Sequence, residues 1–260
     1  MNSKVWLIGG TSDSATIANI LAKSNISLVI TVTTHAAQAL YAANSEIVVG
    51  CMDAIAMGSF CRKNLIKVVI DASHPYATEV SRLAIAVTTQ LDIHYLRYER
   101  NNYQLSTSKQ HNSDVIELDS FDCILAGNYL TNQRALLTIG CQALPKFQSW
   151  QTKATLFARV LPKIKSLEIA IAAGFSGERL IAIRPPISAA TETALWQQWQ
   201  ISLVVTKASG KAGGEDIKRQ VAADLGIPLI VITRPQIDYP EQTSEFSAVL
   251  AFCRKILGNE

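Results

Sequence analysis

Residues 67–76 read Lys67-Val68-Val69-Ile70-Asp71-Ala72-Ser73-His74-Pro75-Tyr76. An apolar run typical of a buried strand leads directly into a turn that carries a carboxyl, a hydroxyl, an imidazole and a phenol group. Pro75 fixes its own φ and disfavours helical geometry at the residue before it, which keeps the turn stiff. Ligands of open parallel sheets bind at the carboxyl ends of the strands, so this turn is the predicted functional site. An alternative is an ordinary turn in which Asp71 or Ser73 caps a helix that begins near Tyr76.

The first half of the chain alternates regularly between strands and helices. Apolar runs predict strands, and the segments between them carry apolar residues at helical spacing. The predicted strands are 5–8, 27–32, 46–49, 67–70 and 93–97, and the predicted longer helices are 11–23, 53–63 and 77–90. Because the strands are apolar throughout, they indicate a parallel sheet that is covered on both faces.

A polar stretch at 99–114 interrupts the alternation, and a second α/β half follows it. Its predicted strands are 136–139, 155–160, 180–183, 203–205 and 229–232, and its predicted helices are 190–200 and 215–225. We therefore predict an α/β protein of two Rossmann-like or flavodoxin-like domains, 1–120 and 121–260, each with a parallel sheet. The first would bind a dinucleotide, and a ligand cleft is expected between the two.

Composition restricts the class of protein. The chain has 260 residues, of which 48% are apolar and 17% charged, and a net charge of +3. No basic run indicates nucleic acid, and the small positive excess suits a small anionic ligand. The longest apolar runs are far short of the about 18 residues that a membrane helix needs, and no apolar signal core follows the N-terminus. The five cysteines lack metal-ligand spacing. We expect a cytoplasmic protein without membrane or nucleic-acid partners or a bound metal, and a monomer is compatible with these features.

The first predicted strand ends in Gly9-Gly10-Thr11-Ser12-Asp13. Glycines at such a turn let backbone N–H groups approach a phosphate, and the N-terminus of the following helix favours negative charge. This turn is the predicted site of the cofactor pyrophosphate. The full G-x-G-x-x-G spacing is absent, so a tight turn with Ser12 or Asp13 as helix cap is an alternative.

The end of the second predicted strand bears on the choice of cofactor. Proteins that select NAD usually place an acidic residue there for the ribose 2′-hydroxyl, but residues 27–38 contain none. The hydroxyls of Thr33 and Thr34 are suited to a 2′-phosphate, although no arginine stands beside them. NADPH is therefore the predicted cofactor, with NADH as the alternative.

Two further segments offer positive charge for an acidic ligand. Lys207 stands in Thr206-Lys207-Ala208-Ser209-Gly210 after another apolar strand, where small residues indicate an anion-binding loop. Arg97 and Arg100 leave the fifth predicted strand, and guanidinium groups suit carboxylates. We predict substrate contacts at Arg97, Arg100, Lys207, Ser209 and Gly210. The alternatives are a surface loop with a solvated lysine, and a surface ion pair between Arg97 and Glu99.

Together these segments resemble the precorrin-6A reductase family of cobalamin biosynthesis, in its cobalt-free and cobalt-bearing branches. The resemblance extends over nearly the whole chain, and its more specific parts are the His-Pro-Tyr turn and the Thr-Lys-x-Ser-Gly loop. It also includes Gly9-Gly10-Thr11, Arg97-Tyr98-Glu99-Arg100, Thr138-Ile139-Gly140, Ala158-Arg159-Val160-Leu161-Pro162 and Arg234-Pro235. Two departures from the family pattern are Ala15, where an arginine is expected, and Arg184-Pro185-Pro186, where the family tends to read Gln-Gly-Pro.

The resemblance implies an NAD(P)H-dependent oxidoreductase that acts on CH–CH bonds. It would deliver hydride to a ring double bond of (cobalt-)precorrin-6A and give (cobalt-)precorrin-6B. The carboxylates of this anionic tetrapyrrole would explain the Arg and Lys residues. We predict catalytic roles for His74, Tyr76 and Asp71 and a cofactor contact at Ser73. The alternatives are a two-domain tetrapyrrole synthase and a small-molecule binding protein, both without nicotinamide.

Overall fold

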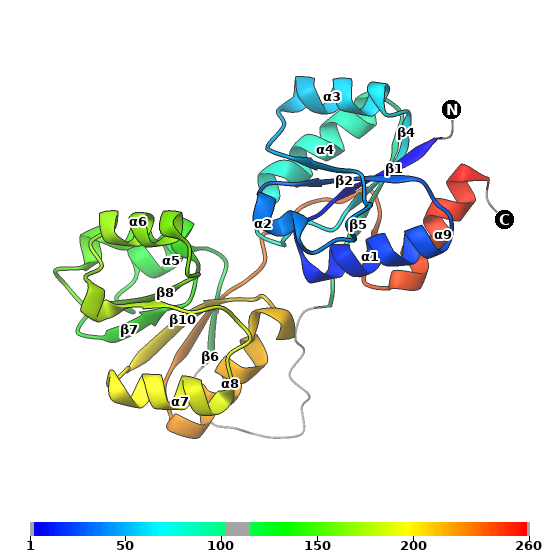
Figure 1. Cartoon of the computed structure of the whole chain (residues 1–260). Helices are drawn as coiled ribbons and strands as arrows, with labels where there is room; N and C mark the ends of the chain where they lie inside the picture. The colour runs from blue at the N-terminus through cyan, green and yellow to red at the C-terminus, as the bar shows by residue number, and fades with distance from the viewer. Residues whose placement is uncertain (1–2, 102–114, 259–260) are drawn as a thin grey trace. The chain divides into compact units, whose positions relative to one another are not determined.

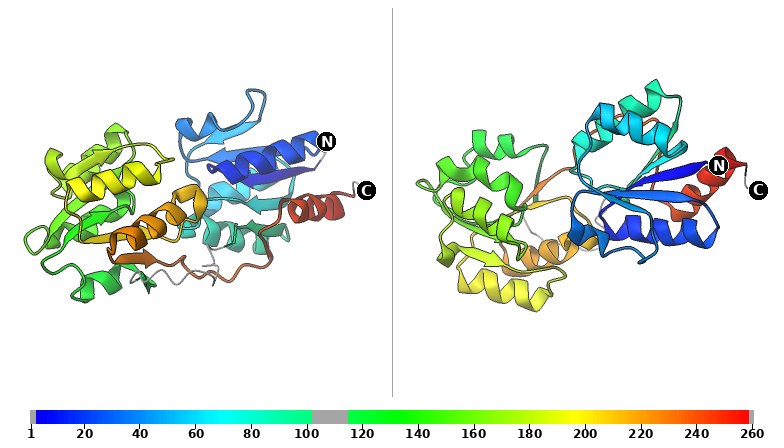
Figure 2. Two further views of the ribbon diagram at one scale, coloured as in Figure 1. Left: turned by 90° about the horizontal axis from the view of Figure 1, so that it is seen from below. Right: turned by 45° about the horizontal axis from the view of Figure 1, so that its top comes forward.

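The computed structural model describes residues 3–101 and 115–258, which form two compact α/β units (Figure 1). The first unit holds the chain up to Arg100 and again from Gln236, and the second holds Asn101–Pro235. Each unit contains a six-stranded sheet in which every neighbouring pair of strands is parallel. The further views in Figure 2 show helices on both faces of each sheet. The predicted α/β class with parallel sheets is confirmed, and the cleft between the two units stays a prediction.

The sheet of the first unit has the strand order β12-β5-β4-β1-β2-β3. Its strands are β1 (Lys4–Ile8), β2 (Leu28–Val32), β3 (Ile47–Val49), β4 (Ile66–Asp71), β5 (His94–Tyr98) and β12 (Gln242–Thr243). The helices of this unit are α1 (Ser12–Lys23), α2 (His35–Gln38), α3 (Ala54–Lys63), α4 (Thr78–Gln90) and α9 (Phe246–Leu257). The order of the chain reverses between β1 and β4, so the carboxyl ends of these two strands form the topological switch point where open α/β sheets bind ligands.

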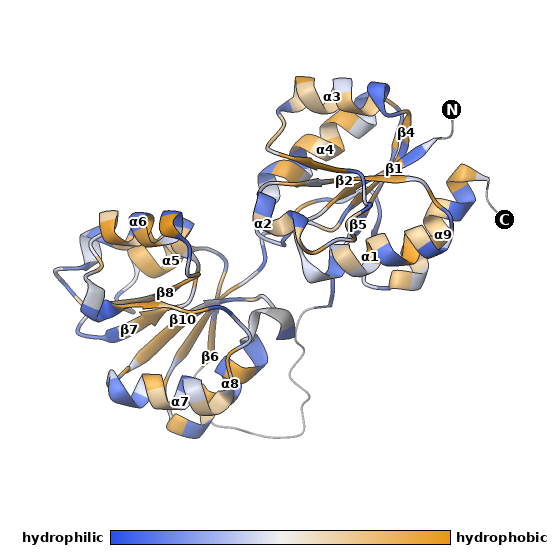
Figure 3. Ribbon diagram, viewed as in Figure 1, coloured by the Kyte–Doolittle hydropathy of each residue, from blue (hydrophilic) through white to orange (hydrophobic). Residues whose placement is uncertain are grey.

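Alternation of side chains along β1 explains why this strand is apolar throughout. Val5 and Leu7 point to one face of the sheet and belong to a core that α1 and α9 cover. Trp6 and Ile8 point to the other face, where α3 and α4 supply the packing residues. Figure 3 shows the result as apolar strands between helices of mixed polarity. A central parallel strand buried on both faces therefore has no polar period in its sequence.

The C-terminal residues complete the first unit, which corrects the predicted second domain of 121–260. Strand β12 pairs with β5 at the sheet edge, where Gln242 lies opposite Arg97 and Thr243 opposite Tyr98. Helix α9 then buries Val249 and Cys253 against the same core as α1. The physical reason is that β5 would otherwise be an open edge over an uncovered apolar face. The first boundary is also earlier than residue 120, because the second unit begins at Asn101.

The sheet of the second unit has the strand order β6-β11-β10-β7-β8-β9. Its strands are β6 (Val115–Leu118), β7 (Arg134–Leu137), β8 (Thr155–Val160), β9 (Leu180–Ala182), β10 (Leu203–Lys207) and β11 (Leu229–Ile232). The helices of this unit are α5 (Phe121–Ala126), α6 (Ile164–Ala172), α7 (Ala189–Gln198) and α8 (Glu215–Leu225), with 3-10 segments η1 (Cys141–Trp150), η2 (Gly177–Arg179) and η3 (Lys211–Gly213). Buried Trp196, Val204 and Val221 belong to one core cluster, in which α7 and α8 pack on the sheet.

Most predicted strands and helices are present within a few residues of their predicted bounds. The pattern missed β6, α5, α6, β12 and α9, three of which are six residues long or shorter. The polar segment 99–114, after which the sequence predicts a boundary, lies mostly outside the described residues. Within residues 3–101 and 115–258, none of the helices combines the length and apolarity that crossing a bilayer requires.

Candidate active site

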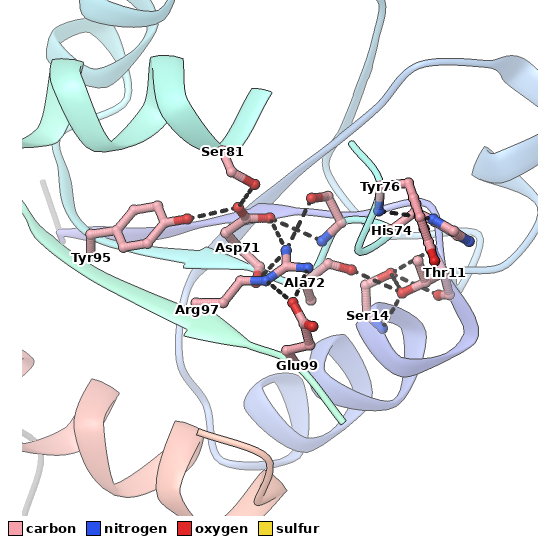
Figure 4. A network of polar contacts seen from close by, with 11 residues as sticks. Thr11, Ser14, Asp71, Ala72, His74, Tyr76, Ser81, Tyr95, Arg97 and Glu99 are labelled. Carbon is pink, nitrogen blue, oxygen red and sulfur yellow. Dashed lines mark hydrogen bonds and ion pairs between the residues drawn. The ribbon is translucent and has the colours of Figure 1, made fainter. Parts of the chain in front are cut away.

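The candidate site begins at the turn after β1, in the first unit. Thr11 is the N-cap of α1 and forms a capping box with Ser14, in which each side chain accepts a hydrogen bond from the other residue's backbone N–H. The Thr11 hydroxyl also donates to the backbone oxygen of Ala72, 2.9 Å away in the turn after β4. The helix cap is therefore Thr11, and neither of the predicted alternatives, Ser12 or Asp13, takes that role. The Thr11 bond ties the two turns of the switch point together (Figure 4).

The two glycines of this turn are required by geometry. Gly10 has a φ of +105°, which a residue with a side chain adopts only with strain. A Cβ atom on Gly9 would lie 2.2 Å from the Tyr41 hydroxyl oxygen. That hydroxyl accepts a hydrogen bond from the Gly10 N–H at 2.8 Å and lies 2.6 Å from the Ser14 hydroxyl. Because Ser14 donates its own hydroxyl hydrogen to the Thr11 backbone oxygen at 2.7 Å, the turn presents one backbone N–H to this oxygen atom at the N-terminus of α1, as a phosphate cradle does.

The turn after β4 carries the predicted His74 and Tyr76. The Tyr76 backbone N–H donates to Nδ1 of His74 at 3.3 Å, and the Ala77 N–H donates to the His74 backbone oxygen at 2.7 Å. The rings of His74 and Tyr76 lie with their centroids 5.7 Å apart. The accepting Nδ1 favours the neutral tautomer of His74 that carries its proton on Nε2. Helix α4 begins only at Thr78, and its N-cap Ala77 makes no side-chain capping bond, so capping by Asp71 or Ser73 is wrong.

Asp71 is fully buried and holds this turn from inside the protein. Its carboxylate accepts hydrogen bonds from the Ser73 N–H at 3.0 Å, the Ser81 hydroxyl at 2.6 Å and the Tyr95 hydroxyl at 2.7 Å, and it pairs with the Arg97 guanidinium at 2.9 Å (Figure 4). A carboxylate with four partners and no exposure does not reach a ligand. The structure thus gives Asp71 a positioning role in place of the catalytic contact expected from the sequence.

Arg97 likewise faces inward, since only 1% of its side chain is exposed. Besides Asp71, its guanidinium pairs with Glu99 at 2.9 Å, donates to the Ser73 hydroxyl at 3.1 Å and lies over the Tyr239 ring. Burial alone would lower the pKa of Arg97, but Asp71, Tyr239 and Glu99 together outweigh this effect and raise it. Arg97 is therefore not positioned for direct substrate contact, and its pair with Glu99 is buried where the sequence alternative expected a surface pair.

Tyr95 and Ser81 are part of this network, and the sequence analysis missed both of them. Burial raises the pKa of Tyr95, and the adjacent Asp71 carboxylate raises it further, so the phenol stays protonated and donates its hydrogen bond. Both residues lie on elements that the sequence predicted, but Ser81 is 10 positions and Tyr95 is 24 positions from Asp71. Only the pairing of β4 with β5 and the packing of α4 bring them to it.

The remaining predicted residues of the first unit lie at the same carboxyl edge of the sheet. Asp13 and Arg100 form an ion pair at 3.2 Å, each about a quarter exposed, so a predicted cofactor residue and a predicted substrate residue pair with each other. Thr34 is the N-cap of α2 and accepts from the Ala37 N–H. Thr33 follows β2 directly and is exposed. The hydroxyl of Thr33 is thus accessible beside the first turn, whereas that of Thr34 is engaged locally.

Lys207, Ser209 and Gly210 belong to the second unit, where Lys207 is the last residue of β10 and the other two follow it. The Lys207 ammonium lies 5.6 Å from the centroid of the Phe121 ring, and burial lowers the pKa of Lys207. The Gly210 N–H donates to the buried Glu215 carboxylate at 2.8 Å, so this N–H already has an acceptor. The turn carries a cation at a strand end, and the Gly210 N–H is satisfied internally, so anion binding by this loop stays a prediction.

The second unit contains another buried cationic side chain, Lys218, which the sequence analysis did not predict. Lys218 is only 2% exposed and donates to the backbone oxygens of Gly213 and Gly214 at 2.7 and 3.1 Å. It lines a small recess of about 120 Å³ together with Arg159 and Pro186. The sequence pattern does not identify Lys218 as buried, because the residues around it are those of an exposed helix face. Among residues 3–101 and 115–258, no group of three or more His, Cys, Asp or Glu is arranged to hold a metal ion.

Comparison with known proteins agrees with the resemblance seen in the sequence. The model of the family Precorrin-6x reductase CbiJ/CobK matches residues 4–254. The cobalt-precorrin-6A reductase of Synechocystis sp. is 40% identical over 258 residues, which is 97% of each chain. The cobalt-precorrin-6A reductase of Priestia megaterium is 30% identical over 252 residues, covering 95% of this chain and 96% of that one.

A solved structure also matches the fold. The protein described as CobK precorrin-6A reductase superposes with a TM-score of 0.78 and covers 97% of this chain and 96% of its own. At 21% identity this likeness concerns the fold alone. An architecture of two α/β units, each with a six-stranded sheet of parallel strands, therefore has a solved counterpart.

Proposed function

Because the chain belongs to the precorrin-6x reductase family CbiJ/CobK, we propose that it reduces a ring double bond of cobalt-precorrin-6A with NADPH. The product would be cobalt-precorrin-6B. The observation that carries the proposal is the Thr11–Ala72 hydrogen bond, which joins the glycine turn and the His-Pro-Tyr turn at the switch point of the first sheet. The two relatives at 30% identity or more cited above both carry the cobalt-bearing name, which favours this substrate over the cobalt-free one.

The first turn would hold the cofactor pyrophosphate. Gly10 offers a backbone N–H, and Gly9 leaves the space in which an oxygen atom already fits. Thr33 would meet the ribose 2′-phosphate, since no carboxylate follows β2 to repel it. Ser12, Asp13, Thr34 and Ser73 stay predicted contacts of the same cofactor. If this reasoning fails, a competition experiment between the two cofactors would show that the protein prefers NADH to NADPH.

The chemistry requires one acid from the chain. Bound NADPH supplies a hydride, which adds to one atom of the double bond and moves an electron pair onto the other atom. A proton delivered to that second atom completes the reduction. We assign this proton to the Tyr76 phenol, because protonating Nδ1 of His74 would break its bond from the Tyr76 N–H. His74 would then remain neutral and orient the substrate through the proton on Nε2.

Positive charge for the substrate carboxylates would come from Arg100, Lys207 and the Ser209-Gly210 loop. Arg97 would act indirectly, since it fixes Ser73 and Asp71 beneath the His-Pro-Tyr turn. A cytoplasmic location, a monomer and a reaction without nucleic acid stay predictions.

Anaerobic oxidation of NADPH tests the reaction. We expect the absorbance of NADPH to fall when cobalt-precorrin-6A is added, and to fall more slowly with the cobalt-free ring. Gly10→Val should abolish NADPH binding, because a side chain strains a φ of +105° and so displaces the backbone N–H that faces the phosphate. Gly226→Val is a matched control, since Gly226 also has a positive φ, +64°, but lies at the end of α8 in the second unit. Normal NADPH affinity in folded Gly10→Val would move the cofactor elsewhere.

Tyr76→Phe tests the proton donor. We expect kcat to fall about 100-fold or more while the Kd for NADPH stays unchanged, because general acid catalysis typically contributes this much. His74→Ala should cost less in kcat and should raise KM for the tetrapyrrole. The opposite order of effects would assign the proton to His74.

A further inference from the structure

Tyr41 lies in the segment between α2 and β3, and its side chain contacts the turn that would hold the cofactor. Its hydroxyl accepts from the Gly10 N–H at 2.8 Å and lies 2.6 Å from the Ser14 hydroxyl. It also fills the space beside Gly9, where a Cβ would come within 2.2 Å of it. One oxygen atom thus takes the two features that make this turn suited to phosphate: a backbone N–H and a missing side chain.

We propose that the Tyr41 hydroxyl occupies the position of a cofactor phosphate oxygen, so that it competes with the pyrophosphate and sets the affinity of the protein for NADPH. This inference rests on the proposed cofactor site at Gly9 and Gly10. Two oxygen atoms do not share one N–H donor at 2.8 Å and one cavity, so the Tyr41 side chain and the pyrophosphate exclude each other. The cofactor therefore binds only after Tyr41 has turned away.

The surroundings of Tyr41 leave room for such a movement. A recess of about 380 Å³ is lined by Tyr41 and also by Gln38, Ala42, Ser45 and Ile47. Tyr41 is held to its own segment by a backbone hydrogen bond from its N–H to the Gln38 oxygen. A rotation about the side-chain bonds that carries the ring into the recess leaves this backbone bond intact. No strand pairing has to be broken.

The proposal predicts the effect of Tyr41→Phe. This variant keeps the ring, which packs against the core of the first unit, and removes the competing oxygen. The free protein loses the hydrogen bond from Gly10, whereas the complex, in which the phosphate has taken that donor, loses nothing. We expect NADPH to bind about three- to tenfold more tightly, which corresponds to the usual net value of one hydrogen bond. KM for NADPH should fall with kcat unchanged.

Isothermal titration of the full-length protein with NADPH measures this effect. Tyr129→Phe is the matched control, since Tyr129 is a partly exposed tyrosine of the second unit, and its Kd should equal that of the unaltered protein. Adenosine 2′-monophosphate, which lacks the pyrophosphate, should bind Tyr41→Phe and the unaltered protein equally. Equal or weaker NADPH binding by folded Tyr41→Phe overturns the proposal.

A second measurement uses the unaltered protein. In a crystal structure with NADPH, we expect the Tyr41 hydroxyl to lie beyond hydrogen-bond distance of the Gly10 nitrogen and a phosphate oxygen to lie within it. A Tyr41 hydroxyl that stays on Gly10 beside the bound cofactor overturns the proposal. The Gly10→Val experiment distinguishes the proposed cofactor site from the proposed role of Tyr41. If Gly10→Val loses NADPH binding while Tyr41→Phe binds NADPH with unchanged affinity, the cofactor site stands and the role of Tyr41 fails. If Gly10→Val binds NADPH normally, both fail.

Discussion

Replacing Asp71 by Asn tests whether the buried ion network holds the first unit together. The variant keeps the shape of the side chain and removes its charge. Asp71 accepts from Ser73, Ser81 and Tyr95 and pairs with Arg97, all without solvent exposure. The Asn amide group would turn a donor toward groups that also donate. The guanidinium would keep only Glu99 as an ionic partner.

The magnitude follows from the burial of the pair. Removing one partner of a buried ion pair costs about 3–5 kcal/mol, because the other charge stays desolvated. Glu99 still neutralises part of the charge of Arg97, so we expect the lower end, about 3 kcal/mol. Glu46→Gln is the control, since Glu46 pairs with Lys4 at the surface, where the two side chains are 50% and 30% exposed. An exposed pair contributes about 0–1 kcal/mol.

Hydrogen exchange followed by mass spectrometry is the suitable assay, because it reports each unit separately. Peptides from β1 and β4 should exchange about 100-fold faster in Asp71→Asn, the factor that corresponds to about 3 kcal/mol. Peptides from β10 and β11 in the second unit should be unaffected. If β1 and β4 exchange no faster than in Glu46→Gln, the network does not stabilise the unit and the positioning role of Asp71 fails.

Three other predictions concern charge and accessibility. Lys207→Ala should weaken tetrapyrrole binding by about 1–3 kcal/mol while Lys211→Ala, its exposed neighbour in η3, has little effect; equal Kd values in a titration would remove Lys207 from the site. Burial lowers the pKa of Lys218 to about 8 from its ordinary 10.5, so the unfolded chain binds more protons between these values and the second unit should gain stability as pH rises from 8 to 10.5. Urea titrations should show that Lys218→Met lacks this gain, and the same slope in both proteins would contradict the assignment. Burial raises the pKa of Cys61 to about 11, so iodoacetamide at pH 8 should label exposed Cys51 and leave Cys61 unlabelled until the protein unfolds.

The two turns of the candidate site were predictable from sequence because their signals are local. A strand followed by Gly9-Gly10-Thr11, and another followed by Ser73-His74-Pro75-Tyr76, each contain the bend and the functional groups within a few residues. The roles of Asp71 and Arg97 were not predictable in the same way. Their pairing joins residues 26 positions apart, and it depends on β4 lying next to β5. The sequence pattern around a charged residue at a strand end is the same whether that residue faces a ligand or a buried partner.

The C-terminal helix shows a signal that was present but insufficient. Phe246, Val249, Leu250, Cys253 and Leu257 follow the helical period and predict one apolar face. The helical period predicts that the apolar face of this helix is buried, but it does not indicate which sheet covers it. Proximity in sequence favoured the second domain. The open edge of β5 and the uncovered face beside α1 determine the observed position.

By itself the sequence determined the α/β class, most of the strands and helices, the two turns of the candidate site and the family to which the chain belongs. These follow from periodicity and short motifs, which each segment carries independently of the others. Only the tertiary structure decided the strand order, the return of the C-terminus to the first sheet, the burial of Asp71 with Arg97 and the contact of Tyr41 with Gly10. Hydrophobic burial requires a partner without specifying it, so these choices depend on segments that are distant in the chain and meet only in the folded protein.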